Sequence, residues 1–165
     1  IRYLKSRGFT VHTVIRNGRD DGFVRTLGAD ENYIDSDFCN ALKFPLLKET
    51  YSAVIDNLGG PVLSCAIRKV ISNGGVAMVG IAASETLSVS IIPFILRGVT
   101  AYGINAEGTD SATRRKIWSE VVRYKEKISI ESLYTITPYH ELPKCPDTLS
   151  KHAPGRRVIS FQKTS

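Results

Sequence analysis

The stretch VIDNLGGPVLSCAIRKVISNGGVAMVG, residues 54–80, decides the fold. Residues 51–57 have the pattern of a strand that runs up to the pair Gly59-Gly60. Pro61 suits the first turn of a helix, because its missing N–H would have no partner there. Residues 62–71 place apolar side chains on one side of a helix, which Asn73-Gly74 is expected to end. Residues 75–81 are almost entirely apolar, as in a parallel strand that is covered on both faces.

The same alternation extends in both directions along the chain. Further strands are predicted at 9–16, 32–34, 99–104, 135–139 and 157–161, and helices at 1–7, 91–97, 111–127 and near 145–152. Repeated strand–helix units favour an α/β domain with a mostly parallel sheet and right-handed crossovers. Ligands of such sheets gather at the carboxyl ends of the strands.

Composition excludes several classes of protein. The 165 residues suffice for one domain, and no apolar stretch approaches the length of a membrane span. The net charge is +6, but the basic residues are scattered, which disfavours nucleic acid as a partner. Cys39, Cys65 and Cys145 are far apart and odd in number, so the sequence predicts neither a metal site nor a disulfide framework. A reducing, cytoplasmic location is the simplest interpretation.

The segment after the first predicted strand carries the first candidate binding residues. It reads Ile15-Arg16-Asn17-Gly18-Arg19 and has no acid at the strand tip, where an NAD-binding sheet holds the ribose hydroxyls. Arginine presents a planar, permanently charged fork that suits a phosphate. Arg16 and Arg19 are therefore candidates for the 2′-phosphate of NADP. The alternative is a solvated basic turn.

Two further segments lie at the predicted carboxyl ends of strands. Asn57, Leu58 and Gly59 follow one strand, and Val79, Gly80, Ile81 and Ala82 end the next. Small residues there leave room for a flat ring, although glycines after strands are often only turns. Asp56 is expected to organise its turn and not to transfer a proton. The chain has no GxGxxG loop and no hydrolase or metalloprotease motif, and its catalytic residues cannot be named.

The order of several short motifs resembles one family. These are LGAD at 27–30, VIDNLGG at 54–60, GGV at 74–76, PFILRGV at 93–99, YGI at 102–104, Arg114-Arg115 with Trp118, and GRRV at 155–158. Together they resemble the medium-chain dehydrogenase/reductase superfamily, and within it the zinc-free quinone oxidoreductases of the acrylyl-CoA reductase type. The resemblance covers nearly the whole chain.

The resemblance implies a Rossmann-like, doubly wound sheet that binds NADP(H) along its carboxyl edge. Arg16, Asn17 and Arg19 would hold the adenosine and its 2′-phosphate, and Asn57, Leu58 and Gly59 would border the middle of the cofactor. The residues expected near the nicotinamide are Val79, Gly80, Ile81 and Ala82, and Ile95 and Leu96 would close over its ring. The neighbouring Arg97 could instead have a structural role. The parent enzyme would transfer hydride to an enone, an enoyl thioester such as acrylyl-CoA, or a quinone. Such enzymes commonly form homodimers through the edge strand equivalent to 99–104.

The resemblance also implies that parts of the parent are absent from this chain. Residues 1–127 would form an incomplete NADP-binding domain without its first strand and glycine-rich loop. Residues 128–165 would return to a GroES-like substrate domain that is mostly missing, so we expect no reductase activity from this chain alone. Three alternatives stay open: a mitochondrial-type enoyl thioester reductase, a non-catalytic module that binds RNA or protein, and a decayed gene remnant.

Overall fold

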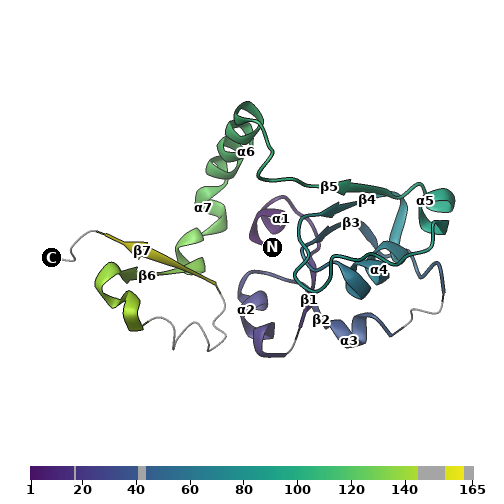
Figure 1. Ribbon diagram of the computed structural model, residues 1–165, viewed down its shortest axis with the longest axis horizontal. Helices are drawn as coiled ribbons and strands as arrows, with labels where there is room; N and C mark the ends of the chain where they lie inside the picture. Colours follow the sequence, from purple (N-terminus) through teal and green to yellow (C-terminus); the bar gives the residue numbers. More distant parts are fainter. Residues whose placement is uncertain (17, 41–43, 145–154, 162–165) are drawn as a thin grey trace. The chain divides into compact units, whose positions relative to one another are not determined.

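The computed structural model describes residues 1–16, 18–40, 44–144 and 155–161 (Figure 1). Contacts divide the chain into two compact units, each of which is described by itself. The first unit comprises Ile1–Thr13, Arg19–Asn32 and Arg115–Ser165, and the second comprises Val14–Gly18 and Tyr33–Arg114. Within the described ranges, no helix has both the length and the apolar character that crossing a bilayer requires.

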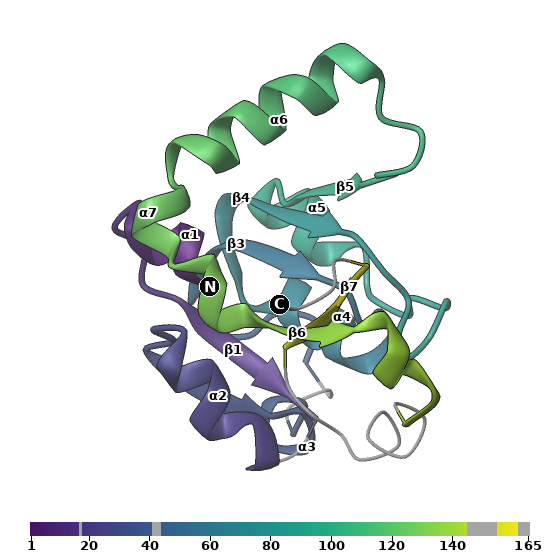
Figure 2. The same ribbon diagram turned by 90° about the vertical axis from the view of Figure 1, so that its left-hand side faces the viewer.

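A three-stranded parallel sheet forms the centre of the second unit. Its strands are β3 (Tyr51–Asp56), β4 (Val70–Met78) and β5 (Thr100–Gly103), in that spatial order. α4 (Gly60–Arg68) connects β3 to β4, and α5 (Ile92–Arg97) precedes β5. Figure 2 shows β3, β4 and β5 side by side. The strand–helix–strand unit and the parallel α/β fold predicted from the sequence are thereby confirmed.

The core of the second unit lies between α4 and the sheet. Leu63 and Ile67 of α4 pack with Val70, Val76 and Val99, and Ile67, Val70 and Val76 are fully buried. Burying an aliphatic side chain of this size stabilises the fold by about 1.5–3 kcal/mol. A neighbouring cluster joins another side of α4 to α3 (Asp35–Phe38) and consists of Phe38, Cys65 and Ala66. Because α4 is apolar on both of these sides, it is held firmly beside the carboxyl end of β3.

The boundary between α4 and β4 differs from the expected one. The helix ends at Arg68 and β4 begins at Val70, whereas the sequence pattern predicted helix to residue 71 and strand only from 75. Val70 pairs with Tyr51 at the start of the sheet, and the register then shifts before regular pairing resumes at Gly75. Asn73, at φ 61°, lies in this irregular part of the strand. Strand pairing with distant residues therefore overrides the local helical pattern.

The remaining strands form two small sheets. β1 (His12–Ile15) pairs with β2 (Glu31–Ile34), and the residues of both strands are divided between the units. None of the described strands joins β1 to β3. η1 (Gly18–Asp20) and α2 (Asp21–Thr26) connect β1 to β2. β6 (Tyr134–Pro138) and β7 (Arg156–Ser160) pair in parallel in the first unit.

Helices make up most of the rest of the first unit. They are α1 (Arg2–Ser6), most of α6 (Ser111–Arg123), α7 (Lys125–Ile128), η2 (Ile130–Leu133) and η3 (Tyr139–Lys144). The single helix expected at 111–127 is divided at Tyr124, and the helix expected near 145–152 lies outside the described residues. Arg2 Nη1 donates to Ile128 O at 3.0 Å and Ser132 Oγ at 2.7 Å, which fixes α1 against α7 and η2. The expected division of the chain between residues 127 and 128 stays a prediction.

Candidate functional site

The carboxyl ends of β3 and β4 are tied together by backbone hydrogen bonds. The segment after β4 folds back over the segment after β3, and its amides donate to successive carbonyls. The bonds run from Val79 N to Asp56 O (2.7 Å), from Ala82 N to Asn57 O (3.0 Å) and from Ala83 N to Leu58 O (2.8 Å). We call residues 57–59 and 79–82 the carboxyl-edge site. The two segments, predicted separately from the sequence, are therefore one feature of the fold.

Asp56 organises the turn that begins this site. Its carboxylate is only 5% exposed and accepts a hydrogen bond from Gly59 N at 2.9 Å. Gly59 has φ 71°, a left-handed conformation that favours glycine because it has no Cβ. α4 begins directly afterwards, at Gly60, with Pro61 in its first turn. Asp56 thus links the end of β3 to the start of α4 through the turn between them.

The glycines of the carboxyl-edge site allow protein backbone to approach protein backbone. A Cβ added to Gly59 would lie 2.1 Å from Ser84 O, and one added to Gly80 would lie 2.9 Å from Asn57 O. The sequence left open whether these glycines make room for a ligand or only form turns, and in the structure their close neighbours are the two loops themselves. Ser84 was not anticipated, because nothing in its sequence context indicates a neighbour some 25 positions earlier.

The side chains that the carboxyl-edge site presents to solvent are mostly apolar. Ile81 is 66% exposed and Val79 is 47% exposed, and Ala82 is exposed beside them. Asn57 adds an exposed amide, which can both donate and accept hydrogen bonds. A flat ligand with a polar rim could contact the apolar residues with its face and Asn57 with its edge.

The predicted phosphate-binding residues are only partly described. Arg16 follows β1 directly and its side chain is exposed, so its guanidinium is accessible to an anion. Asn17 lies outside the described residues. Arg19 lies within η1, in the first unit, whereas Arg16 belongs to the second. Among the side chains described at the end of β1, that of Arg16 supplies an accessible cation.

Ile95 and Leu96 lie away from the carboxyl-edge site. They belong to α5, which packs near the start of β4, at the opposite end of the parallel strands (Figure 1). A Cβ added to Gly98, just after α5, would lie 3.1 Å from Asn73 Oδ1 in the first half of β4. Both residues are more than two-thirds exposed. The structure thus does not bring them to the site that they were expected to close.

Arg97 explains why α5 is held at that end of the sheet. Its Nη1 donates to Arg68 O at 2.9 Å and to Val70 O at 3.1 Å, and its Nη2 donates to Leu47 O at 2.6 Å. Its Nε lies 3.4 Å from a carboxylate oxygen of Glu49, and its side chain is only 11% exposed. One guanidinium therefore joins three segments at the end of α4. The alternative structural role that the sequence allowed for Arg97 is the one that the structure shows.

Titratable side chains do not gather as metal ligands in the part of the chain that the structure describes. No group of three or more His, Cys, Asp or Glu side chains is placed there so that it could hold a metal ion. The groups that the structure does present for binding are the exposed amide, the apolar residues and the cation described above.

Comparison with known proteins points to one group of enzymes. The chain is 27% identical over 157 residues to acrylyl-CoA reductase AcuI from Ruegeria pomeroyi, covering 94% of this chain and 48% of that protein. It is 26% identical over 166 residues to YhfP from Bacillus subtilis, which is provisionally named a quinone oxidoreductase, covering 98% of this chain and 49% of that protein. No family model matches the chain.

Solved structures show that the chain shares the fold of these proteins. The chain superimposes on the yhdH oxidoreductase from Salmonella enterica, solved in complex with NADP, with a TM-score of 0.85 and 26% identity, over 98% of this chain and 49% of that one. Bacillus subtilis yhfP, solved with NAD bound, matches with a TM-score of 0.84 and 24% identity, over 96% and 49% of the two chains. The chain is therefore similar to the oxidoreductases AcuI, YhdH and YhfP, and it spans about half the length of the curated relatives it matches.

Proposed function

We propose that this chain is the cofactor-binding part of an NADP(H)-dependent oxidoreductase that reduces an α,β-unsaturated carbonyl compound. The substrate class would be an enoyl thioester such as acrylyl-CoA, or a quinone. The observation that carries the proposal is the carboxyl-edge site, where β3 and β4 end together and present an amide beside exposed apolar residues. Ligands of parallel α/β sheets bind at this edge.

The residues present fit two of the three parts of an NADP molecule. Val79 and Ile81 offer an apolar surface for the nicotinamide ring, with Asn57 at its polar rim. Arg16 offers a permanent charge for the 2′-phosphate, and no acidic residue stands at the tip of β1 to compete for it. The pyrophosphate is the third part, and a GxGxxG loop to hold it does not occur in the sequence.

NADPH, when bound, supplies the hydride of the proposed reaction. The residues of this chain would bind and orient the cofactor and keep water from one face of its ring. The hydrogen bonds from Val79 N to Asp56 O and from Ala82 N to Asn57 O hold the site in one shape before a ligand arrives. Such preorganisation reduces the entropy that a ligand must lose on binding.

The proposal also concerns three details of the reaction and the assembly: the hydride acceptor, the oligomeric state and the acid that protonates the product. The homologues named as acrylyl-CoA and quinone reductases support either acceptor. All four residues of β5 are exposed, which is compatible with the expected homodimer through residues 99–104. No general acid is assigned to this chain. We expect this chain by itself not to turn over substrate.

Calorimetric titration of the chain with NADPH and NADH tests the proposal. We expect NADPH to bind more tightly by about tenfold to a hundredfold, because a charged hydrogen bond contributes about 1.5–3 kcal/mol. Arg16→Ala should remove most of this preference and leave NADH binding unchanged. Arg115→Ala, which removes an exposed cation on α6, is the matched control. A folded chain that binds neither nucleotide, or both equally, contradicts the proposal.

A second calorimetric titration, with RNA in place of the dinucleotides, distinguishes the non-catalytic alternative. A nucleic-acid-binding module would bind RNA with an affinity that falls steeply as salt rises, because binding releases counterions. We expect no such binding, since Arg2, Arg97 and Arg114 all donate to carbonyls within the chain. Tight, salt-dependent RNA binding that Arg16→Ala leaves intact would favour the alternative.

A further inference from the structure

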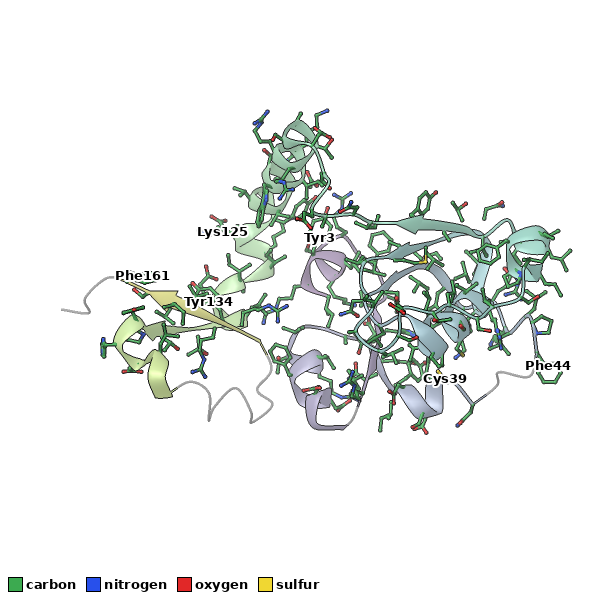
Figure 3. The ribbon with its side chains drawn as sticks, viewed as in Figure 1. Tyr3, Cys39, Phe44, Lys125, Tyr134 and Phe161 are labelled. Carbon is green, nitrogen blue, oxygen red and sulfur yellow. The ribbon has the colours of Figure 1, made fainter. Side chains whose placement is uncertain are left out.

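Two of the three cysteines meet in the second unit, although they are far apart in the sequence. Cys39 follows α3 directly (Figure 3), and Cys65 lies in the middle of α4. Cys39 packs against the cluster that contains Cys65, and Cys65 Sγ donates to the carbonyl of the neighbouring Phe38 at 3.0 Å. The wide spacing in the sequence gave no sign of this pair.

The pair is held in place by well-packed neighbours. Cys65 is fully buried, Phe38 is 5% exposed, and Cys39 packs against the cluster that these residues form with Ala66. Lys69 Nζ lies 3.8 Å from the centre of the Phe38 ring and 3.3 Å from Phe38 O, which fixes the end of α3 against α4. Cys39 and Cys65 are consequently kept within the same packed cluster of the folded chain.

Access to the two sulfur atoms is unequal. Cys39 is partly exposed, whereas Cys65 has no exposed surface. An oxidant from solvent can reach only the first sulfur directly. This arrangement, one accessible thiol with a second thiol behind it, is that of an attacking and a resolving cysteine.

We propose that Cys39 and Cys65 are a site of reversible modification, at which a hydroperoxide converts the two thiols into an intramolecular disulfide. Cys39, as its thiolate, attacks one peroxide oxygen, so the O–O bond breaks and a sulfenic acid forms at Cys39. Cys65 Sγ then attacks the sulfur of Cys39, the S–S bond forms, and the hydroxyl leaves as water with the proton of Cys65. Both sulfur atoms are oxidised, and the peroxide is reduced to water or to an alcohol and water.

The protonation state of the pair sets the speed of this reaction. Burial raises the pKa of Cys39 to about 11, with Cys65 and Asp35 acting in the same direction and Lys69 opposing them. Burial also raises the pKa of Cys65, against the opposing charges of Lys69 and Arg68. Only the thiolate attacks, so oxidation should be slow at neutral pH and accelerate about tenfold per pH unit below the pKa. Prolonged exposure to the peroxide, or a high concentration of it, is therefore needed to form the disulfide at neutral pH.

The disulfide would close a loop that contains β3 and the start of the carboxyl-edge site. It would join the end of α3 to α4, whose first residue follows the Gly59 turn. A cross-link of this kind restricts mainly the unfolded chain and so raises the unfolding temperature. Reduction by a dithiol would restore the two thiols through thiol–disulfide exchange.

Peroxide treatment of a Cys145→Ser chain tests the site with only these two thiols present; Cys145 itself lies outside the described residues. We expect the folded protein to lose both alkylatable thiols, to yield one peptide pair that links residues 39 and 65, and to unfold at a higher temperature. The reaction should be faster at pH 9 than at pH 7 by about a hundredfold. A dithiol should reverse every change.

Cys39→Ser is the matched control, because it removes the accessible thiol and leaves the buried helix position intact. In this variant Cys65 should stay reduced under the same treatment. The proposal is overturned if the folded Cys145→Ser chain keeps both thiols alkylatable after denaturation, or if its only disulfides join separate molecules. Rapid oxidation of Cys65 in the Cys39→Ser variant would also contradict the proposed order of attack.

Discussion

Replacement of Arg97 with alanine tests whether one guanidinium determines the position of α5. The side chain donates three hydrogen bonds, to Arg68 O, Val70 O and Leu47 O, and lies against Glu49. Alanine would remove all of these interactions at once. Arg68 O would keep its bond from Leu47 N at 2.9 Å, whereas Val70 O and Leu47 O would lose the bonds that Arg97 donates to them.

The magnitude follows from the burial of the group. Each hydrogen bond to a charged group contributes about 1.5–3 kcal/mol net, and breaking a buried charged contact typically costs about 3–5 kcal/mol. Arg97 is 11% exposed and Glu49 is 44% exposed, so solvent screens part of the ion pair but little of the bonding to carbonyls. We therefore expect the free energy of unfolding to fall by about 3–5 kcal/mol. This is a large part of the total of about 5–15 kcal/mol that is typical of a natural domain.

Urea unfolding followed by circular dichroism measures this loss. Arg97→Lys keeps the charge but not the planar fork, and should recover only part of the stability. Arg115→Ala removes an exposed arginine from α6 and should change the free energy of unfolding by less than about 0.5 kcal/mol. If Arg97→Ala also changes the free energy of unfolding by less than about 0.5 kcal/mol, the reasoning about Arg97 is refuted.

Two further changes are expected to alter stability. Gly59→Ala should lower the free energy of unfolding in urea by at least about 2 kcal/mol, because φ is 71° and the new Cβ would approach Ser84 O. Gly22→Ala in α2, where a Cβ would meet no other atom within 4 Å, should not destabilise the chain. Two hydrogen bonds lower the pKa of the Asp30 carboxyl in the folded state. The bond from Lys5 has the larger effect, and the bond from the backbone amide of Val11 has the smaller one. The contribution of Asp30 is therefore present above the pKa of the unfolded state and lost as pH falls through the lower folded pKa. Melting temperatures between about pH 5 and pH 2 should fall less steeply for Asp30→Asn, and an unchanged slope would contradict this assignment.

Local sequence patterns were sufficient for the order and type of most elements. The apolar alternation around residues 54–80 predicts β3, α4 and β4, since each of these elements buries its own apolar residues in the core. The turn at Asp56 was also predictable, because a short acid before a glycine pair commonly organises a turn. These features depend on residues that are close together in the chain.

Long-range contacts account for what the patterns did not predict. The early end of α4 depends on the pairing of Val70 with the distant Tyr51, and the position of α5 depends on carbonyls that Arg97 reaches across the fold. The meeting of Cys39 with Cys65 depends on how α3 packs against α4. None of these contacts has a signature in the spacing of a single sequence.

The most direct test of the central claim is an NMR titration of the isotope-labelled chain with NADPH. The account predicts that the backbone amides of Arg16, Asn57, Ile81 and Ala82 shift in a saturable manner, whereas the amides of Ile95 and Leu96, at the other end of the strands, do not. NADH should shift the amides of the carboxyl-edge site while leaving that of Arg16 nearly unchanged. Shifts confined to residues 95 and 96, or no saturable shifts in a folded chain, would contradict the claim that the carboxyl-edge site binds NADP(H).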